Sequence, residues 1–292
     1  MKGKILKGIG GFYYVAADDN KIYECKAKGI FRNKKVKPLV GDDCEISILD
    51  KEECIGNIDI IFDRKNELIR PAAANADQAV IIFALSRPRP SVNLLDRFLI
   101  LMEYQDVDTV ICFNKEDIAE DGEAEGLADM YKTAGYEVMI TSVKENRGID
   151  ELRGRLKGKT SILAGPSGVG KSSMINALIP EAMAETGSLS EKIARGKNTT
   201  RHSELMKVDE DTFIMDTPGF SSLMLPDISA EELRFYYPEM VPFEGKCRFD
   251  GCNHINEPDC MVKCAVGDKE INEKRYENYK ILYEELTSRR KW

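Results

Sequence analysis

Short stretches that alternate apolar and polar side chains fill the first part of the chain. Turn residues separate them, and they cover residues 4–9, 11–16, 21–25, 43–49 and 56–61. Strands with one buried face alternate in this way, and several in succession are typical of small antiparallel barrels. We therefore predict an all-β domain over residues 1–68, of the OB type, with an SH3-like barrel as the alternative.

From residue 77 the pattern changes to continuous apolar runs separated by helical periods. Residues 78–85 and 109–113 are almost wholly apolar, as strands buried on both faces are. Between them, apolar residues recur at helical spacing after Ser91, a suitable N-cap. Further strands are predicted at 137–141, 161–164 and 213–216, and helices at 123–134, 149–156 and 172–178. This alternation predicts an α/β domain over residues 69–221, with its ligand at the carboxyl ends of the strands.

Residues 222–292 form a third predicted domain. Helices are expected at 230–236 and 269–289, and cysteines and a histidine gather between them. This part of the chain should be mostly α-helical around a metal site.

Composition changes this picture only locally. The formal charge of −8 argues against a protein that coats nucleic acid through net charge. Residues 1–40, however, hold ten Lys and Arg against three acidic residues, an excess that suits a phosphate backbone. A solvated basic face is the alternative.

The chain has the features of a cytoplasmic protein. It opens Met-Lys-Gly-Lys with no apolar segment behind, so we expect no signal peptide. No apolar run is long enough to span a bilayer, so no membrane association is expected. Four cysteines are scattered singly and four crowd into residues 247–264, which favours a reducing compartment with one metal site over disulfides.

Residues 165–172 match the pattern of a phosphate-binding loop, called the phosphate loop below. They read Gly-Pro-Ser-Gly-Val-Gly-Lys-Ser, between a predicted strand and a predicted helix. Glycines let backbone N–H groups wrap a phosphate, and the helix adds its positive N-terminal end. Lys171 should reach the β- and γ-phosphates, and the Ser172 hydroxyl should ligate Mg²⁺.

Residues 114–117 form a base-recognition segment. They read Asn-Lys-Glu-Asp directly after the apolar strand at 109–113. The Asp117 carboxylate can accept two hydrogen bonds from guanine, whereas adenine offers no such donor pair. Thr141 and Ser142, after the next strand, are expected to contact the base through the backbone, although a simple turn explains them equally well.

Two further segments complete the expected nucleotide site. Residues 216–219 read Asp-Thr-Pro-Gly, so Asp216 should hold Mg²⁺ through a water and the Gly219 N–H should sense the γ-phosphate. Either Thr199 or Thr200 should complete the Mg²⁺ shell, with Thr200 favoured and an ordinary loop threonine as the alternative. Many GTPases follow that glycine with a water-orienting Gln, but Phe220 stands here, so intrinsic turnover should be slow.

Soft ligands cluster near the C-terminus. A closed, structural zinc site needs four ligands, and this segment offers five candidates, so one is spare. The candidates are Cys247, Cys252, His254, Cys260 and Cys264. Free thiols in a loop are the alternative.

The order of the motifs is unusual for a GTPase. The base-recognition segment precedes the phosphate loop, which indicates a circularly permuted domain whose sheet closes as usual. With the basic barrel and the Cys/His knot, the whole chain resembles the RsgA (YjeQ) family of bacterial small-ribosomal-subunit biogenesis GTPases. The nucleotide-binding residues expected on these motifs are Asn114, Lys115, Glu116, Asp117, Thr141, Ser142, Gly165, Pro166, Ser167, Gly168, Val169, Gly170, Lys171, Ser172, Ser173 and Asp216.

The resemblance implies further expectations. It carries the zinc ligands onto Cys247, Cys252, His254 and Cys260, with Cys264 spare, and it implies a monomer that binds GTP, GDP, the small ribosomal subunit and its rRNA. The subunit should stimulate GTP hydrolysis. The switch loop of the family usually holds a His where this chain has Asn198, which can orient water but cannot act as a base. The expected catalytic residues are Lys171, Asn198, Thr200 and Gly219.

Two other functions compete with this one. A non-catalytic RNA-binding assembly factor would keep the nucleotide site only as structure. A phosphate-loop kinase would transfer a phosphoryl group to a small acceptor without a guanine preference, against which residues 114–117 argue.

Overall fold

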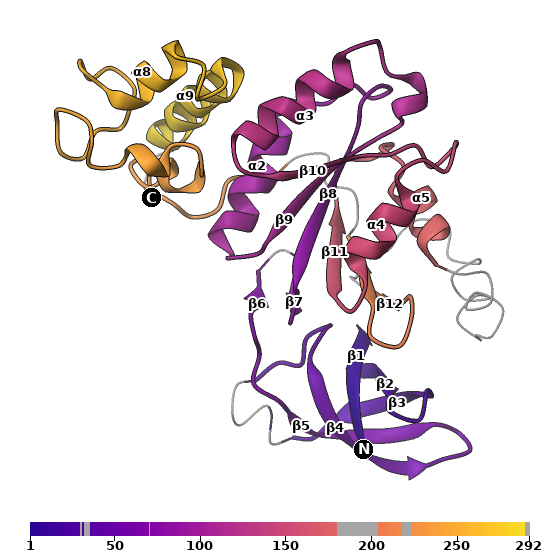
Figure 1. The fold of residues 1–292 in the computed structure, drawn as a ribbon. Helices are drawn as coiled ribbons and strands as arrows, with labels where there is room; N and C mark the ends of the chain where they lie inside the picture. Colours follow the sequence, from indigo (N-terminus) through magenta and orange to yellow (C-terminus); the bar gives the residue numbers. More distant parts are fainter. Residues whose placement is uncertain (30, 32–35, 70, 180–203, 218–222, 290–292) are drawn as a thin grey trace. The chain divides into compact units, whose positions relative to one another are not determined.

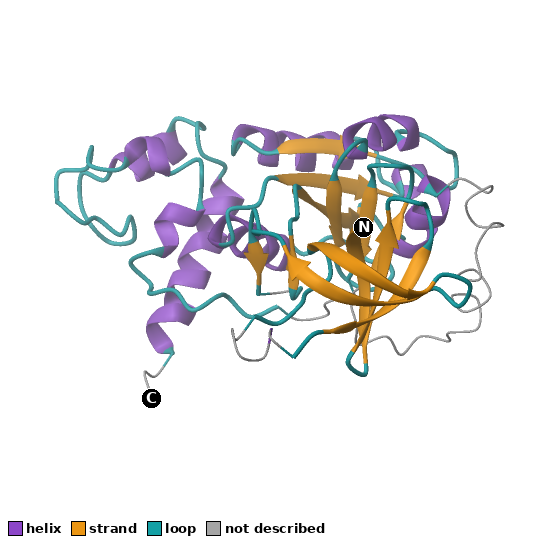
Figure 2. Cartoon of the chain, turned by 90° about the horizontal axis from the view of Figure 1, so that it is seen from below, coloured by secondary structure: helices purple, strands orange, loops and turns teal. Residues whose placement is uncertain are grey.

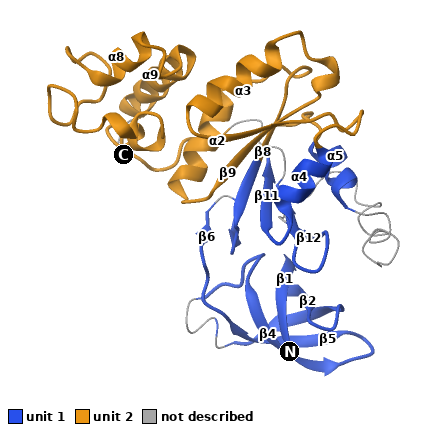
Figure 3. Cartoon of the chain, in the orientation of Figure 1, with its two compact units in different colours: residues 1–80, 149–164, 171–219 blue, residues 81–148, 165–170, 220–292 orange. Residues whose placement is uncertain are grey.

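The computed structural model describes residues 1–29, 31, 36–69, 71–179, 204–217 and 223–289 (Figure 1). The described chain divides into two compact units, coloured separately in Figure 3. Unit 1 comprises residues 1–80, 149–164 and 171–219, and unit 2 comprises residues 81–148, 165–170 and 220–292.

The N-terminal part of unit 1 is a closed five-stranded barrel, as predicted. Its strands curve around a common core (Figure 2) and run in the order β1-β2-β3-β5-β4. Their bounds are β1 Lys2–Ile9, β2 Phe12–Ala17, β3 Ile22–Ala27, β4 Asp43–Asp50 and β5 Ile55–Ile61. β3 and β5 pair in parallel and the other pairs are antiparallel. Alternate side chains, among them Ile5, Val15 and Ile58, fill the core. This order fits the OB-type barrel.

The central part is an α/β sheet with strand order β10-β9-β8-β11-β13-β12. Its strands are β8 Gln78–Ala84, β9 Thr109–Asn114, β10 Glu137–Ile140, β11 Thr160–Ala164, β12 Glu204–Lys207 and β13 Phe213–Asp216. β9 pairs with β10 in parallel and β11 with β13 in parallel, whereas β12 is antiparallel to β13. Every residue of β8 and β11 is buried, which explains their continuous apolar character.

The helices that accompany the sheet begin where the sequence predicts, within two residues. They are α2 Val92–Tyr104, α3 Glu123–Thr133, α4 Ile149–Leu156 and α5 Lys171–Leu178. Ser91 is the N-cap of α2, and its hydroxyl accepts a hydrogen bond from the Leu94 N–H at 3.3 Å. Short elements that the sequence did not predict include β6 Glu67–Leu68, β7 Ala73–Ala74, η1 Glu116–Ile118 and β12.

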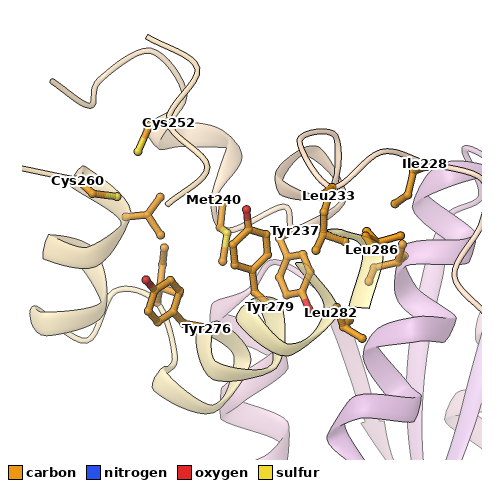
Figure 4. Packing of buried hydrophobic residues seen from close by; sticks show 14 of the residues in the cluster. Ile228, Leu233, Tyr237, Met240, Cys252, Cys260, Tyr276, Tyr279, Leu282 and Leu286 are labelled. Carbon is orange, nitrogen blue, oxygen red and sulfur yellow. The ribbon is translucent and has the colours of Figure 1, made fainter. Parts of the chain in front are cut away.

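The C-terminal part of unit 2 packs around buried tyrosines (Figure 4). Tyr237, Tyr276 and Tyr279 form the centre of this core together with Met240 and Leu282. Its elements are η2 Leu233–Tyr236, η3 Val241–Phe243, α8 Met261–Gly267 and α9 Glu273–Ser288. The predicted α-helix at 230–236 is wrong, because only the short 3₁₀ turn η2 forms there. Pro238 favours an extended residue before it, and Tyr237 accordingly has φ −119° and ψ 92°.

A buried ionic cluster fixes α9 against α2 within unit 2. Arg275 of α9 is 1% exposed and pairs with Asp96 of α2 and with Glu239, at 2.7 and 2.9 Å from the two Glu239 oxygens. Asn278 donates a second hydrogen bond to Asp96. Burial raises the pKa of the Asp96 carboxyl, and the Arg275 charge opposes that rise.

Among the described residues, no helix combines the length and the apolar character needed to cross a bilayer.

Candidate nucleotide and metal sites

The phosphate loop has a backbone that requires glycine at two positions. Gly165 has φ +149°, and a Cβ atom there would lie 2.1 Å from the carbonyl oxygen of Ile82. Gly170 has φ +98°, and its Cβ would lie 2.4 Å from Nδ2 of Asn114. Any larger residue would displace β8 or the base-recognition segment. The two glycines therefore allow the loop to pass close to its neighbours.

The base-recognition segment is bonded directly to the phosphate loop within unit 2. Asn114 is 2% exposed and donates from Nδ2 to the Val169 carbonyl at 2.9 Å. Lys115 donates from Nζ to the Gly168 carbonyl at 2.7 Å and to the carbonyl of Arg87 at 2.5 Å. Two segments that stand in reversed order along the chain are thus brought together in space.

Asp117 is held as an ionised acceptor. Its Oδ1 accepts a hydrogen bond from the Ser142 hydroxyl at 2.7 Å, and its Oδ2 lies 3.4 Å from Lys144 Nζ. The Ser142 hydrogen bond, with Lys144, lowers the pKa of Asp117 despite partial desolvation. The sequence predicted only a backbone role for Ser142. Its hydroxyl in fact positions the carboxylate, and no signal beyond its place after β10 could have indicated this.

Thr141 and Glu116 complete this part of the site. Thr141 is fully buried and donates from Oγ1 to Asn114 Oδ1 at 3.2 Å. The Glu116 N–H donates to the Thr141 carbonyl at 3.2 Å, and the Glu116 side chain pairs with Arg147 at 3.3 Å. These contacts join the ends of β9 and β10.

Unit 1 carries the residues expected to act on phosphate and Mg²⁺. Lys171 begins α5 directly after Gly170, and the exposed Ser172 and Ser173 follow it. Asp216 ends β13 opposite Leu163 of β11. Burial raises the pKa of Asp216 and lowers that of Lys171, and the opposite charge of each opposes the shift of the other.

The Asp216 carboxylate fits a magnesium site. In the described part of the chain its Oδ1 is buried and has no hydrogen-bond partner. A buried, unsatisfied carboxylate oxygen is costly unless a cation or an ordered water satisfies it. Asp216 and the Ser172 hydroxyl are oxygen ligands of the kind that Mg²⁺ prefers. Asn198, Thr200, Gly219 and Phe220 lie outside the described residues.

The remaining residues of the phosphate loop differ in exposure. Val169 is 1% exposed and anchors the loop, whereas Ser167 and Gly168 are exposed and Pro166 is half-buried.

Four of the five candidate metal ligands come together in the C-terminal part of unit 2. The ligand atoms of Cys247, Cys252, His254 and Cys260 all lie within 4.8 Å of one another. We call these four residues the cysteine cluster. Cys264 is exposed and lies outside it. Burial raises the pKa of the Cys252 thiol to about 12, so a thiolate there needs a nearby cation. Three sulfurs and one imidazole suit tetrahedral Zn²⁺, and the cluster could hold such a metal.

Comparison with known proteins agrees with this architecture. The RsgA GTPase family model matches residues 61–226, and the RsgA N-terminal domain model matches residues 2–55. The chain belongs to the RsgA GTPase family. A small ribosomal subunit biogenesis GTPase RsgA of Agathobacter rectalis is 54% identical over the full length of both chains. Another of the same name, from Alkaliphilus metalliredigens, is 46% identical over 100% of this chain and 99% of its own.

Solved structures of two family members share the fold. YjeQ from Thermotoga maritima has a TM-score of 0.83 and 36% identity, with 99% of each chain covered. YloQ, described as a circularly permuted GTPase, has a TM-score of 0.80 and 37% identity over 100% of this chain and 96% of its own. The predicted permuted GTPase fold and the predicted family are confirmed, and the chain is a GTP hydrolase.

Proposed function

We propose that this RsgA-family GTPase binds the small ribosomal subunit and its rRNA, and assists late maturation of the subunit. It hydrolyses GTP to GDP and phosphate, slowly alone and faster on the subunit. The observation that carries the nucleotide assignment is the bonding of Asn114 and Lys115 to the phosphate-loop backbone. The ribosomal assignment is supported by relatives named as small ribosomal subunit biogenesis GTPases.

The residues expected to contact phosphate, Mg²⁺, base and water have separate proposed roles. Lys171 neutralises the β- and γ-phosphates, and Asp117 accepts the hydrogen bonds of guanine. Asp216 and Ser172, with Thr200, hold Mg²⁺, which when bound neutralises charge on the phosphate oxygens. The Gly219 N–H contacts the γ-phosphate, and Asn198 orients the attacking water.

The barrel, proposed as a domain over residues 1–68, supplies the rRNA contact. Lys26 is exposed and lies over the Phe12 ring at 5.0 Å, a pairing of cation and aromatic ring that suits RNA. Lys4 and Lys7 contribute less, because they pair with Asp43 at 2.8 Å and Glu204 at 2.7 Å. The permuted GTPase domain is proposed over residues 69–221 and the zinc domain over 222–292, in a monomer that acts in the cytoplasm.

Small subunits are expected to accelerate single-turnover GTP hydrolysis by a factor on the order of 100 or more, as groups supplied by a partner do in other GTPases. The measurement compares the protein alone, with small subunits and with large subunits. Equal rates in all three would favour the alternative of a non-catalytic assembly factor with a structural nucleotide site.

Zinc removal is expected to unfold the cysteine cluster, because structural zinc contributes folding free energy directly. We expect one zinc ion per chain, and loss of hydrogen-exchange protection in α8 and the loop before it after chelation. Cys260→Ser should lose the metal.

Cys264→Ser is the matched control, since Cys264 is exposed and outside the cluster. A Cys264→Ser protein that loses zinc as readily as Cys260→Ser would contradict the proposed ligand set.

A further inference from the structure

The two ring nitrogens of His254 have different surroundings. Nδ1 lies 3.3 Å from Cys260 Sγ and 3.6 Å from Cys247 Sγ, so it faces the cysteine cluster. Nε2 lies 3.1 Å from Oε1 of Glu244. The imidazole is 1% exposed, so neither nitrogen can exchange its partner for bulk water without local opening.

The His254 backbone holds the ring in this orientation. His254 has φ +61°, a left-handed backbone conformation that few residues other than glycine adopt. Tyr276 donates its hydroxyl to the His254 carbonyl at 2.7 Å, and the Glu257 carboxylate accepts from the N–H groups of Asn253 and Ile255 at 2.8 and 2.9 Å. The turn that carries the ring is therefore fixed from both sides.

Glu244 is itself held by a second residue. Arg234 Nε lies 3.2 Å from the same Glu244 oxygen, an ion pair that lacks hydrogen-bond geometry, and Arg234 Nη1 donates to Asn253 Oδ1 at 2.9 Å. Arg234 is mostly buried, so this ion pair is poorly screened by solvent. A fixed negative charge thus stands at the Nε2 side of the ring.

A neutral imidazole carries one N–H and one lone pair, and its hydrogen-bond partner decides which nitrogen keeps the proton. A carboxylate can only accept, so Glu244 favours the proton on Nε2 and leaves the lone pair on Nδ1. We propose that Glu244, which pairs with the charge of Arg234, is a positioning residue that directs His254 to bind the metal through Nδ1. This inference rests on the proposed zinc site and adds to it the binding atom and the residue that selects it.

Zinc affinity tests the role of Glu244. Partners of this kind typically contribute 10- to 100-fold to metal affinity, so Glu244→Ala should weaken zinc binding by about that factor in chelator competition on the full chain. Glu244→Gln keeps an acceptor oxygen without the charge and should be intermediate. Glu270→Ala is the matched control, because Glu270 is an exposed glutamate in the same part of the chain. Wild-type affinity in Glu244→Ala would overturn the proposal.

The nitrogen that binds the metal is read independently of affinity. The chain has two histidines, so ¹⁵N spectra of the zinc-loaded protein are assigned with a single His202→Gln variant. The expected result is a metal-bound Nδ1 and a protonated Nε2, whose proton exchanges faster in Glu244→Ala. A metal-bound Nε2 would overturn the proposal and leave the zinc site standing, whereas a wild-type protein that takes up no zinc would remove the zinc site itself.

Discussion

An Asp117→Asn variant is expected to bind GTP about 100-fold more weakly and to gain affinity for xanthosine triphosphate. Hydrogen bonds to a charged group contribute roughly 1.5–3 kcal/mol each, and the substitution removes the charge and one acceptor. In the structure the Ser142 hydroxyl donates a hydrogen bond to Oδ1 of Asp117 at 2.7 Å. The amide that replaces the carboxylate would keep its oxygen toward Ser142 and turn its NH₂ toward the base. An NH₂ matches the C2 oxygen of xanthine and repels the exocyclic amine of guanine.

Fluorescence titration with the two nucleotides measures this exchange of specificity. Asp121→Asn, an exposed aspartate after the same strand, is the control and should leave both affinities unchanged. Ser142→Ala should weaken GTP binding by roughly 10-fold, the contribution of about one hydrogen bond, without raising the affinity for xanthosine triphosphate. Unchanged GTP affinity in Asp117→Asn would refute the base-recognition role of this carboxylate.

The pKa of Asp117 adds a pH dependence to this prediction. Because its folded pKa lies below the ordinary value, the carboxylate stays ionised as the solution is acidified through the usual range of Asp. Guanine binding should therefore persist at mildly acidic pH. It should weaken only when the pH approaches the lowered pKa.

The motifs whose chemistry is local were predictable from the sequence. The phosphate loop needs glycine because of its own backbone, and β8 and β11 read as buried strands because each residue along them is covered. Each motif also has its own strand and turn beside it in the sequence, so it can be recognised wherever it stands along the chain. The reversed order of the motifs therefore indicated the permuted fold.

Residues whose role depends on a distant partner were not predictable. Glu244 and Arg275 are charged, and a charge in the sequence usually indicates a solvated face. Only the tertiary structure brings Glu244 to His254 and Arg275 to Asp96. The helix predicted at 230–236 failed for a different reason, because spacing of apolar residues does not distinguish an α-helix from the short 3₁₀ turn that forms at Leu233–Tyr236.

Arg275→Leu is expected to destabilise the C-terminal part of unit 2 by about 3–5 kcal/mol, because it leaves buried carboxylates without their cation. Arg275 is 1% exposed and contacts Asp96 and Glu239, whose side chains are 0% and 4% exposed. Its guanidinium also lies over the rings of Tyr131 and Tyr237, at 5.2 and 4.7 Å from their centroids. Among the described residues, the other side chains that bond Asp96 are the uncharged Tyr131 and Asn278, so no second cation would neutralise this carboxylate.

Urea unfolding followed by circular dichroism, with hydrogen exchange in α9, measures the loss. Arg289→Leu is the matched control, because Arg289 pairs with Glu285 near the end of the same helix but both side chains are about a third exposed. Arg289 also donates long hydrogen bonds to the Leu225 and Pro226 carbonyls at 3.4 and 3.5 Å, and this partly exposed pair should contribute less than about 1 kcal/mol. An equal decrease in unfolding free energy in the two variants would show that the buried ionic cluster stabilises the protein no more than the partly exposed pair.

The pH dependence of the Arg275→Leu loss separates charge from packing. Burial already raises the pKa of Asp96 in the native protein, and removing the opposing Arg275 charge raises it further. A carboxyl group with a raised folded pKa destabilises the native state above its unfolded pKa, and the cost falls as it becomes protonated. The difference in unfolding free energy from wild type should therefore shrink between neutral pH and the ordinary pKa range of Asp. A difference that stays constant over this window would mean that lost packing of the Arg275 side chain, and not an uncompensated carboxylate, causes the destabilisation.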